Sequence, residues 1–268
     1  MDYSAFRDGE RDGWSSRADI YRDATARATL QTIPQLLNDA HLFPGARVLD
    51  AGCGPGYVAA CAKLLGAEVE GIDFSDGMVG LAKTQFPDIE FSLADVEDLP
   101  ARDETFDMVL SNIVLFHVTD PGRAMSEARR VLKQNGRFVF SQWLGPDRSK
   151  CYKLLFDVLG RHADMSRADP APNAYILADE AKVTEMMQNA GFADITSEVV
   201  ENVLHAPGSS FFDFFMNFGV RIPLILERQE PDIQVSIRKE IDALAAQYWS
   251  SDCYRIPMPS IVFSGRAK

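Results

Sequence analysis

Residues that bind metals or form disulfides are scarce in this sequence. The chain of 268 residues has only four cysteines and four histidines. No two cysteines stand in a C-x-x-C pair, and none is spaced with a histidine as the ligands of a structural zinc site are. We therefore expect reduced thiols, no metal site and a cytoplasmic location.

The sequence also has fewer positively charged residues than negatively charged ones. The chain has 27 Lys and Arg residues against 39 Asp and Glu residues, which gives a formal net charge of -12 at pH 7. Proteins that bind nucleic acid need a basic surface for the phosphates. The composition therefore disfavours nucleic acid as a partner.

Long apolar stretches are absent as well. No run approaches the roughly 20 apolar residues that a membrane span needs. The first residues, MDYSAFRDGERDGW, are charged and polar, so we expect neither a signal peptide nor an Arg-rich transit peptide. The composition, with 46% hydrophobic and 25% charged residues, is that of a globular protein long enough for one α/β domain with insertions.

Glycine, by contrast, is concentrated in one short segment. Residues 47–57 read RVLDAGCGPGY, in which an apolar run ends at Asp50 and breaks into a turn with Gly52, Gly54 and Gly56. A buried strand, a glycine turn and a helix in that order form a binding corner for a nucleotide or cofactor, because a ligand can lie against backbone without Cβ atoms. A dinucleotide fingerprint, G-x-G-x-x-G, does not fit, because tyrosine occupies its last glycine position.

The sequence around this turn alternates predicted strands and helices. Such alternation indicates an α/β fold of the doubly wound, Rossmann-like type, with a mostly parallel seven-stranded sheet. The expected strands are residues 47–50, 68–73, 89–94, 106–111, 137–142, 195–202 and 260–266. The expected helices of this part are 58–65, 76–86, 121–132, 152–161 and 179–190.

We expect residues 1–268 to form a single domain. Its cofactor-binding core is expected at 44–145, and 259–268 supplies the last strand. Prolines and a cluster of phenylalanines interrupt the alternation elsewhere, which indicates a helical cap on the core. The cap segments are 1–43, 146–178 and 205–258, the last with a predicted helix at 232–249. In the first segment, Ser16 and Asp19 have the spacing of a capping box and predict the start of a helix.

Three acidic residues end successive predicted strands at the same edge of the sheet. These residues are Asp50, Asp73 and Asp95. Each alone could be a helix cap or a solvated turn residue, but ligands of open α/β sheets bind at this edge. Asp73 has the spacing of an acid that binds ribose hydroxyls, and Asp95 could accept a hydrogen bond from an exocyclic amine such as that of adenine. Together they predict a ligand site.

Four segments stand out between residues 47 and 143, and they read VLDAGCGPG, GIDFSDGMVGLA, ADVEDLPARDETFDMV and VLKQNGRFVFS. They resemble successive motifs of class I S-adenosylmethionine-dependent methyltransferases. The branch that they resemble includes ubiquinone and menaquinone methyltransferases. The chain lacks the N/D-P-P-Y segment with which adenine-N6 and glutamine methyltransferases hold a planar amide or amine.

The resemblance implies S-adenosyl-L-methionine as the cofactor. It implies that Asp73 binds the ribose, that Phe74 and Met78 flank the adenine, and that Asp95 and Val96 read the adenine edge. The glycine turn would line the methionine moiety, with the backbone around Ser111 and Asn112 near its carboxylate or sulfonium. The full set of expected cofactor contacts is Asp50, Gly52, Cys53, Gly54, Gly56, Asp73, Phe74, Met78, Asp95, Val96, Ser111 and Asn112.

The candidates for catalysis and substrate binding lie outside these motifs. His117 follows the fourth predicted strand, and histidine is the side chain suited to act as a base near neutral pH, although it could equally cap local backbone. Tyr21 is the second candidate base or orienting group. Trp14, Phe211 and Phe215 are expected to bind substrate, but all three could instead pack in the core of the cap.

The expected function is methyl transfer to a small, apolar or aromatic metabolite, with oxygen or carbon favoured over nitrogen as the acceptor. The protein would align the acceptor, remove its proton and exclude water. Two alternatives remain open at this stage. One is a nucleotide-dependent oxidoreductase on the same fold, and the other is a non-catalytic protein that binds S-adenosylmethionine and has a regulatory role.

Overall fold

The computed structural model describes residues 2–268 of the chain. Its central sheet has seven strands in the order β3-β2-β1-β4-β5-β10-β6, and β10 is antiparallel to both of its neighbours. The other pairings in this sheet are parallel. The predicted doubly wound, mostly parallel seven-stranded sheet is thus confirmed. Its strands are β1 (Arg47–Ala51), β2 (Glu68–Asp73), β3 (Glu90–Leu93), β4 (Phe106–Asn112), β5 (Leu132–Trp143), β6 (Phe192–Val200) and β10 (Ser260–Ala267).

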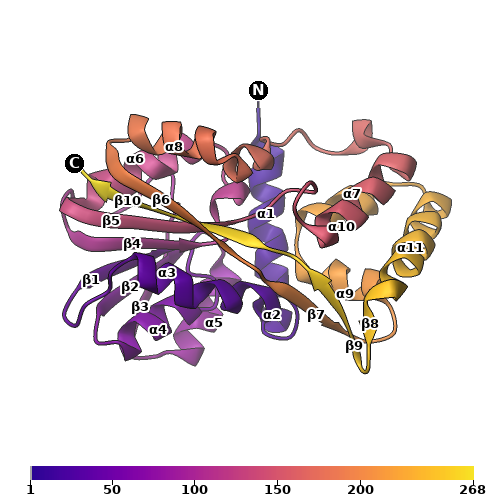
Figure 1. Cartoon of the computed structure of the whole chain (residues 1–268), viewed down its shortest axis with the longest axis horizontal. Helices are drawn as coiled ribbons and strands as arrows, with labels where there is room; N and C mark the ends of the chain where they lie inside the picture. The colour runs from indigo at the N-terminus through magenta and orange to yellow at the C-terminus, as the bar shows by residue number, and fades with distance from the viewer. Residues whose placement is uncertain (1) are drawn as a thin grey trace.

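Helices cover both faces of this sheet (Figure 1). On one face α6 (Pro121–Val131) and α8 (Glu180–Asn189) pack in a core that includes Phe138 and Phe263. On the other face lie α3 (Ile33–Asp39), α4 (Tyr57–Leu64) and α5 (Asp76–Gln85). The buried strands read as nearly continuous apolar runs because both of their faces are covered.

Several helices begin at residues whose side chains cap the first turn. Ser75 Oγ accepts the N–H of Met78 (3.2 Å) at the start of α5, and Asp120 Oδ1 accepts the N–H of Arg123 (3.0 Å) at the start of α6. None of the helices formed by residues 2–268 is both long and apolar enough to cross a membrane. Short 3-10 helices lie at Ala18–Ile20, Leu30–Thr32, Leu115–His117, Met165–Arg167, Ala174–Ala178 and Ala246–Tyr248.

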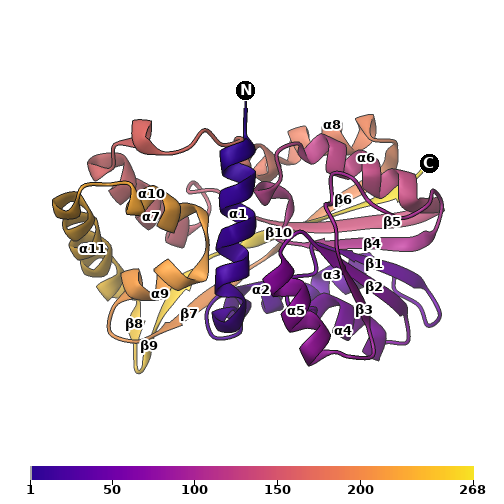
Figure 2. The same ribbon diagram turned by 180° about the vertical axis from the view of Figure 1, so that it is seen from behind.

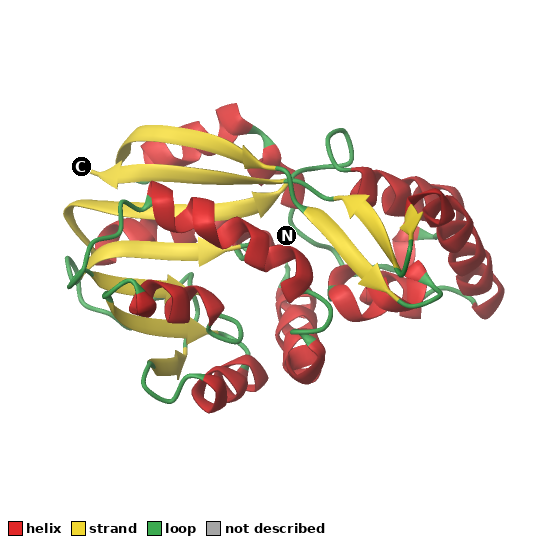
Figure 3. Ribbon diagram, turned by 60° about the horizontal axis from the view of Figure 1, so that its bottom comes forward, coloured by secondary structure: helices red, strands yellow, loops and turns green. Residues whose placement is uncertain are grey.

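The cap lies beyond the carboxyl ends of the parallel strands. It consists of helices around a small antiparallel sheet with the order β7-β9-β8 (Figure 3). β7 follows directly after β6, and β9 leads into β10, so the small sheet extends from the edge of the large one. The sequence predicted helices in this region but not the small sheet. The cap elements are α7 (Lys150–His162), β7 (Val203–Pro207), α9 (Phe211–Phe218), α10 (Arg221–Glu227), α11 (Pro231–Ala245), β8 (Trp249–Ser250) and β9 (Cys253–Pro257).

The N-terminal helix differs from the prediction. α1 (Ser4–Arg17) runs between the cap and the helices of the sheet, and the short α2 (Ala26–Thr29) follows it (Figure 2). The predicted capping box at Ser16 is wrong, because Ser16 lies inside α1 and its Oγ donates to the carbonyl of Gly13 (2.9 Å). The buried face of α1 has glutamate and glycine at helical spacing beside two aromatic residues, so its apolar periodicity is weak. These buried residues are Phe6, Glu10, Gly13 and Trp14.

Candidate active site

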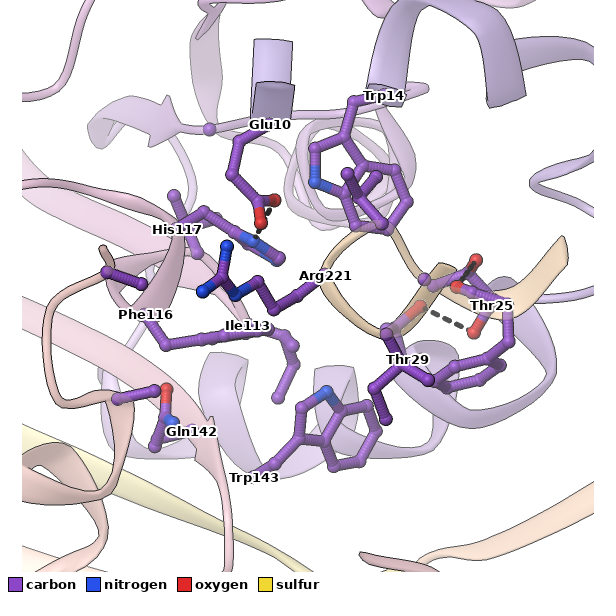
Figure 4. Close-up of a pocket in the computed structure, with 18 of the residues that line it drawn as sticks. Glu10, Trp14, Thr25, Thr29, Ile113, Phe116, His117, Gln142, Trp143 and Arg221 are labelled. Atoms are coloured by element: carbon purple, nitrogen blue, oxygen red, sulfur yellow. Dashed lines mark hydrogen bonds and ion pairs between the residues drawn. The ribbon is translucent and has the colours of Figure 1, made fainter. Parts of the chain in front are cut away.

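A cavity of about 360 Å³ lies between the carboxyl edge of the sheet, α1 and the cap. The glycine turn after β1 and the segment after β4 border it on the side of the sheet, and Figure 4 shows Ile113, Phe116 and His117 of the second segment. Its lining is mostly apolar and includes eleven aromatic residues: Phe6, Trp14, Tyr21, Phe74, Phe116, Trp143, Tyr152, Phe156, Tyr175, Phe215 and Phe218. The polar and charged side chains that also line it are Glu10, Thr25, Thr29, Asp73, Asn112, His117, Gln142, Asn173 and Arg221.

The structure brings ten of the predicted site residues to this cavity. They come from α1, the turn after the 3-10 helix Ala18–Ile20, the glycine turn, the ends of β2 and β4, the 3-10 helix Leu115–His117, the start of α5, and α9. They are Trp14, Tyr21, Gly52, Gly54, Asp73, Phe74, Met78, Asn112, His117 and Phe215.

Three predicted cofactor contacts near the glycine turn lie outside the cavity. Asp50 is fully buried and accepts the N–H of Ala59 (2.9 Å), so it supports the start of α4. Cys53 packs in the apolar cluster beneath the turn. Gly56 has a left-handed φ of 87°, and a Cβ there would lie 2.7 Å from the ring of Phe91. This glycine therefore serves close packing rather than approach by a ligand.

Four further candidates also lie away from the cavity. Asp95 pairs with Arg7 of α1 and accepts the N–H of Glu97 (2.8 Å). Ser111 Oγ donates to the carbonyl of Ala51 (2.8 Å), which ties β4 to β1. Val96 packs in the main core of the sheet, and Phe211 packs in the core of the cap. Phe211 thus does not line the cavity, contrary to expectation, because its position on α9 faces Tyr254 of the small sheet.

Asp73 and the glycine turn form the polar end of the cavity on the side of the sheet. One carboxylate oxygen of Asp73 accepts the N–H of Gly54 (2.8 Å) and the other accepts the N–H of Ser75 (2.9 Å). Burial raises the pKa of Asp73, and these backbone hydrogen bonds oppose the rise by stabilising the carboxylate. Gly54 has a φ of 50°, and a Cβ at this position would have no protein atom within 4 Å. The backbone of the turn is therefore open to a ligand.

Asn112 is held at the end of β4 by a hydrogen-bond network. Its Nδ2 donates to the carbonyl of Thr29 (3.1 Å), and its Oδ1 accepts from Ser141 Oγ (2.6 Å). The same Ser141 Oγ accepts the N–H of Ile113 (2.9 Å). The network fixes the left-handed Ile113, whose φ is 60°, and so shapes the segment that leads to His117.

His117 forms a pair with Glu10, a residue that sequence reasoning missed. Nδ1 of His117 lies 2.7 Å from Oε2 of Glu10, whose side chain is only 1% exposed (Figure 4). The Oε1 atom of Glu10 is buried without a hydrogen-bond partner among residues 2–268. Because a carboxylate can only accept, Nδ1 donates, and Nε2 is the ring nitrogen that is left to accept a proton. The histidine ring also lies against Phe116 and the edge of Trp14.

Tyr21 also lines the cavity, with its hydroxyl 3.3 Å from Thr29 Oγ1. Burial raises the pKa of Tyr21 to about 12, because the phenolate would lose its hydration. The phenol is therefore protonated at neutral pH. Such a group can orient a ligand by hydrogen bonding, but it is a poor base.

Two other polar residues of the cavity were also missed. Gln142, near the end of β5, has a buried Oε1 without a partner in the described part of the chain, and its place at the carboxyl edge of the sheet could have marked it. Arg221 begins α10 and reaches the cavity from the cap. No motif pointed to Arg221, because its position depends on how the cap folds back over the sheet.

Comparison with known proteins agrees with this geometry. Residues 49–140 match a family model described as a methyltransferase domain. A ubiquinone/menaquinone biosynthesis C-methyltransferase of Teredinibacter turnerae is 32% identical over 169 residues, which cover 56% of this chain and 68% of that protein. A demethylmenaquinone methyltransferase of Renibacterium salmoninarum is 28% identical over 196 residues, or 69% and 83% of the two chains.

The fold is shared more widely than the sequence. The crystal structure of the YcgJ protein from Bacillus subtilis superposes with a TM-score of 0.60 and 18% identity, and the match covers 88% of this chain and 98% of that one. The family-model match includes the glycine turn and the ends of β2 and β4, which border the cavity. This chain belongs to the class I S-adenosylmethionine-dependent methyltransferases, and it is an enzyme whose cofactor is S-adenosyl-L-methionine.

Proposed function

We propose that the enzyme methylates an oxygen or carbon atom of a small, apolar or aromatic molecule, with nitrogen as the less favoured acceptor. The observation that carries this proposal is a histidine held by a buried glutamate, which lines a cavity whose walls are mostly apolar and rich in aromatic residues. The matched relatives are named as methyltransferases of demethylmenaquinone and of ubiquinone/menaquinone biosynthesis, which supports a small apolar acceptor.

The residues at the glycine turn fit the cofactor. The open space over Gly54 admits a ligand, and the buried Asp73 offers acceptor lone pairs to ribose hydroxyls. Phe74 and Met78 supply apolar surface for the adenine. When bound, S-adenosylmethionine supplies a methyl group that its positively charged sulfur makes electrophilic. The predicted contacts outside the cavity remain predictions, and of these Asp95 already pairs with Arg7 and accepts the N–H of Glu97.

His117 is proposed as the general base. Glu10 orients the ring and stabilises positive charge on it, as a buried carboxylate does for the histidine of a catalytic triad. Nε2 of His117 would take the proton that the acceptor loses when its new bond to the methyl carbon forms. A positioned base of this kind contributes about 10²–10⁴-fold to the rate.

The other cavity residues orient the acceptor and exclude water. Trp14 is 9% exposed and packs with Met78 between α1 and α5, so that it closes the cavity on that side. Phe215 supplies part of the cap wall. Tyr21, protonated because its pKa is raised, is assigned to orientation rather than to proton removal.

The test is a screen of small metabolites with release of S-adenosylhomocysteine as the readout, followed by substitution of the pair. We expect His117→Ala and Glu10→Gln to lower kcat by at least about tenfold while the affinity for S-adenosylhomocysteine stays nearly unchanged. Loss of the base should affect the transition state rather than the binding of the cofactor.

His162→Ala is the matched control. His162 also pairs with a glutamate, Glu240, but this pair lies on the cap and does not line the cavity. Its loss should leave kcat unchanged. If His117→Ala retains full turnover and only lowers the melting temperature, the pair is structural and the assigned base is wrong.

A further inference from the structure

Arg221 places an unpaired positive charge in the wall of the cavity. Its guanidinium lies over the ring of Phe6, 5.6 Å from the ring centroid, and Nη2 donates to the backbone carbonyl of Asp169 (2.6 Å). No carboxylate oxygen of residues 2–268 lies within 4.0 Å of this guanidinium. Figure 4 shows it among Glu10, His117 and Phe116, directed into the cavity.

The nearby acids are committed to other partners. The carboxylate of Asp169 pairs with Arg228, with Nη1 2.6 Å from Oδ1, so only the backbone of Asp169 serves Arg221. Glu10 accepts its hydrogen bond from His117. Burial lowers the pKa of Arg221, because the charged guanidinium loses hydration, yet arginine remains protonated at any physiological pH. Glu10 and Asp169 lie near enough to oppose this fall in the pKa, but neither forms a direct ion pair with Arg221 within the described residues.

The remaining polar atoms of the cavity are of the opposite kind. Oε1 of Glu10 and Oε1 of Gln142 are buried acceptors without partners in the part of the chain that the structure describes. An anionic group of a ligand would be repelled by these oxygens and attracted by Arg221. A hydroxyl or N–H group would be favoured beside them. The cavity thus has one position for an anion and two for hydrogen-bond donors.

We propose that Arg221 binds a carboxylate of the methyl acceptor, so that the substrate is an apolar or aromatic carboxylic acid. The planar fork of an arginine matches the two oxygens of a carboxylate. A single positive charge also balances a carboxylate, whereas a phosphate would bring a second negative charge close to Glu10. The inference rests on the proposed function and names the substrate class for the same cavity.

Arg221 is proposed to select the substrate, not to take part in the chemistry. Its removal should therefore weaken the binding of acids and spare that of neutral analogues of the same shape. This can be measured without turnover, on the complex with S-adenosylhomocysteine. The result is then independent of whether His117 is the base.

The experiment compares matched pairs of acid and amide by calorimetric titration. The probes are 2-naphthoate and 2-naphthamide, indole-3-acetate and indole-3-acetamide, and decanoate and decanamide. For at least one pair, we expect wild-type protein to bind the acid about tenfold or more tightly than the amide. Arg221→Gln should reduce this preference to less than about threefold, mainly by weakening the binding of the acid.

Arg238→Gln is the matched control. Arg238 also lies in the cap over a phenylalanine ring, 5.7 Å from the centroid of Phe212, but it pairs with Asp213 and does not line the cavity. The Arg238→Gln protein should keep the wild-type preference for the acid over the amide. Unchanged binding of S-adenosylhomocysteine verifies that the Arg221→Gln protein is folded. Should that variant not fold, Arg221→Lys retains the charge without the fork and should give a smaller preference than wild type.

Three outcomes would overturn the proposal. One is that none of the acids binds wild-type protein more tightly than its amide, which includes failure of all acids to bind. Another is that Arg221→Gln or Arg221→Lys keeps the full preference. The third is that 2-naphthyl phosphate binds more tightly than 2-naphthoate, which would assign the site to phosphate. If His117→Ala loses turnover but still binds the acid more tightly than the amide, the result bears on the general base and not on Arg221.

Discussion

Asp50 is a buried carboxyl group whose charge the fold does not neutralise. One oxygen accepts the N–H of Ala59, and the other has no partner within residues 2–268. Burial raises its pKa to about 7. In the unfolded chain an aspartate has a pKa of about 3.9, so between about pH 4 and pH 7 the folded state holds a proton that the unfolded state has lost. The stability linked to this proton is complete below about pH 4 and is lost as the pH rises to about 7.

Asp50→Asn should remove this loss of stability with rising pH. The amide keeps an acceptor for Ala59 but cannot ionise, so the free energy of unfolding should fall less between pH 4 and pH 8 than in wild type. The difference between the two proteins should change by about 2–4 kcal/mol over this range, measured by urea denaturation. Asp88→Asn, at an exposed position, is the control for loss of one negative charge. Parallel stability curves for wild type and Asp50→Asn would contradict the prediction.

Asp73 combines a structural and a binding role at one carboxylate. Asp73→Ala should weaken the binding of S-adenosylhomocysteine by about 1.5–3 kcal/mol, because charge-assisted hydrogen bonds to the ribose are lost. It should also lower the free energy of unfolding, because the N–H groups of Gly54 and Ser75 lose their acceptor. Calorimetric titration and urea denaturation measure the two effects separately.

Asp95→Ala gives the comparison for this prediction. Asp95 lies outside the cavity and pairs with an arginine that is itself largely exposed, so its removal should change stability little. A loss of cofactor affinity in Asp95→Ala would show that this acid binds adenine. Unchanged affinity in Asp73→Ala would mean that the ribose is bound elsewhere.

Among the elements, α1 approaches its neighbours through two glycines. A Cβ on Gly77 of α5 would lie 2.6 Å from the carbonyl oxygen of Ser15, and a Cβ on Gly13 would lie 2.4 Å from Val220. Ser15 Oγ also donates to Asp76 Oδ1 (2.7 Å). These contacts allow α1 to lie close enough to both α5 and the cap for Glu10 and Trp14 to reach the cavity.

Gly77→Ala should therefore displace α1 from α5. The added methyl group meets backbone atoms, which cannot rotate away, so we expect lower stability, weaker binding of S-adenosylhomocysteine and faster proteolysis within α1. Gly80→Ala on the same helix is the control, because a Cβ there has no atom within 4 Å. It should raise the free energy of unfolding by about 0.5–1 kcal/mol. Equal behaviour of the two variants would show that α1 does not depend on this contact.

The elements differ in how well the sequence predicted them. The central strands were predicted because they are apolar runs buried on both faces, as β1 and β4 are, or because an aspartate ends them, as Asp73 ends β2. α1 was not predicted with its actual bounds, because Glu10 and Gly13 occupy positions where a helix buried against a core usually has apolar residues. The small sheet was missed because β8 has only two residues and β7 continues the chain direction of β6.

The candidate site divides in the same way. Gly54, Asp73 and Asn112 were predicted because local motifs at strand ends place them at one edge of the sheet. Glu10 and Arg221 were not, because each enters the cavity through contacts between segments far apart in the sequence. A motif records the local chain, whereas the far wall of the cavity depends on tertiary packing.

On the scale of the whole molecule, the cap and the sheet share a hydrophobic core. Trp143 at the end of β5 and Ile113 after β4 pack in the same cluster as Phe215 and Ile237 of the cap. Ala24, in the turn before α2, and Ala28 of α2 also belong to this cluster. The chain also passes directly between the sheets, from β6 to β7 and from β9 to β10. We therefore propose that residues 1–268 fold as a single domain.

This proposal predicts that the cap and the sheet unfold together. Hydrogen exchange of β1 and of α11 should report the same free energy of unfolding, because a shared core cannot be lost in only one part. S-adenosylhomocysteine at a hundred times its dissociation constant should raise both values by about 2.7 kcal/mol, although its predicted contacts with the glycine turn lie far along the chain from α11. Ile237→Ala, which opens a cavity in the cap, should lower both by about 2–5 kcal/mol. If the ligand protects β1 alone and Ile237→Ala affects α11 alone, the cap is an independent unit and the single domain is wrong.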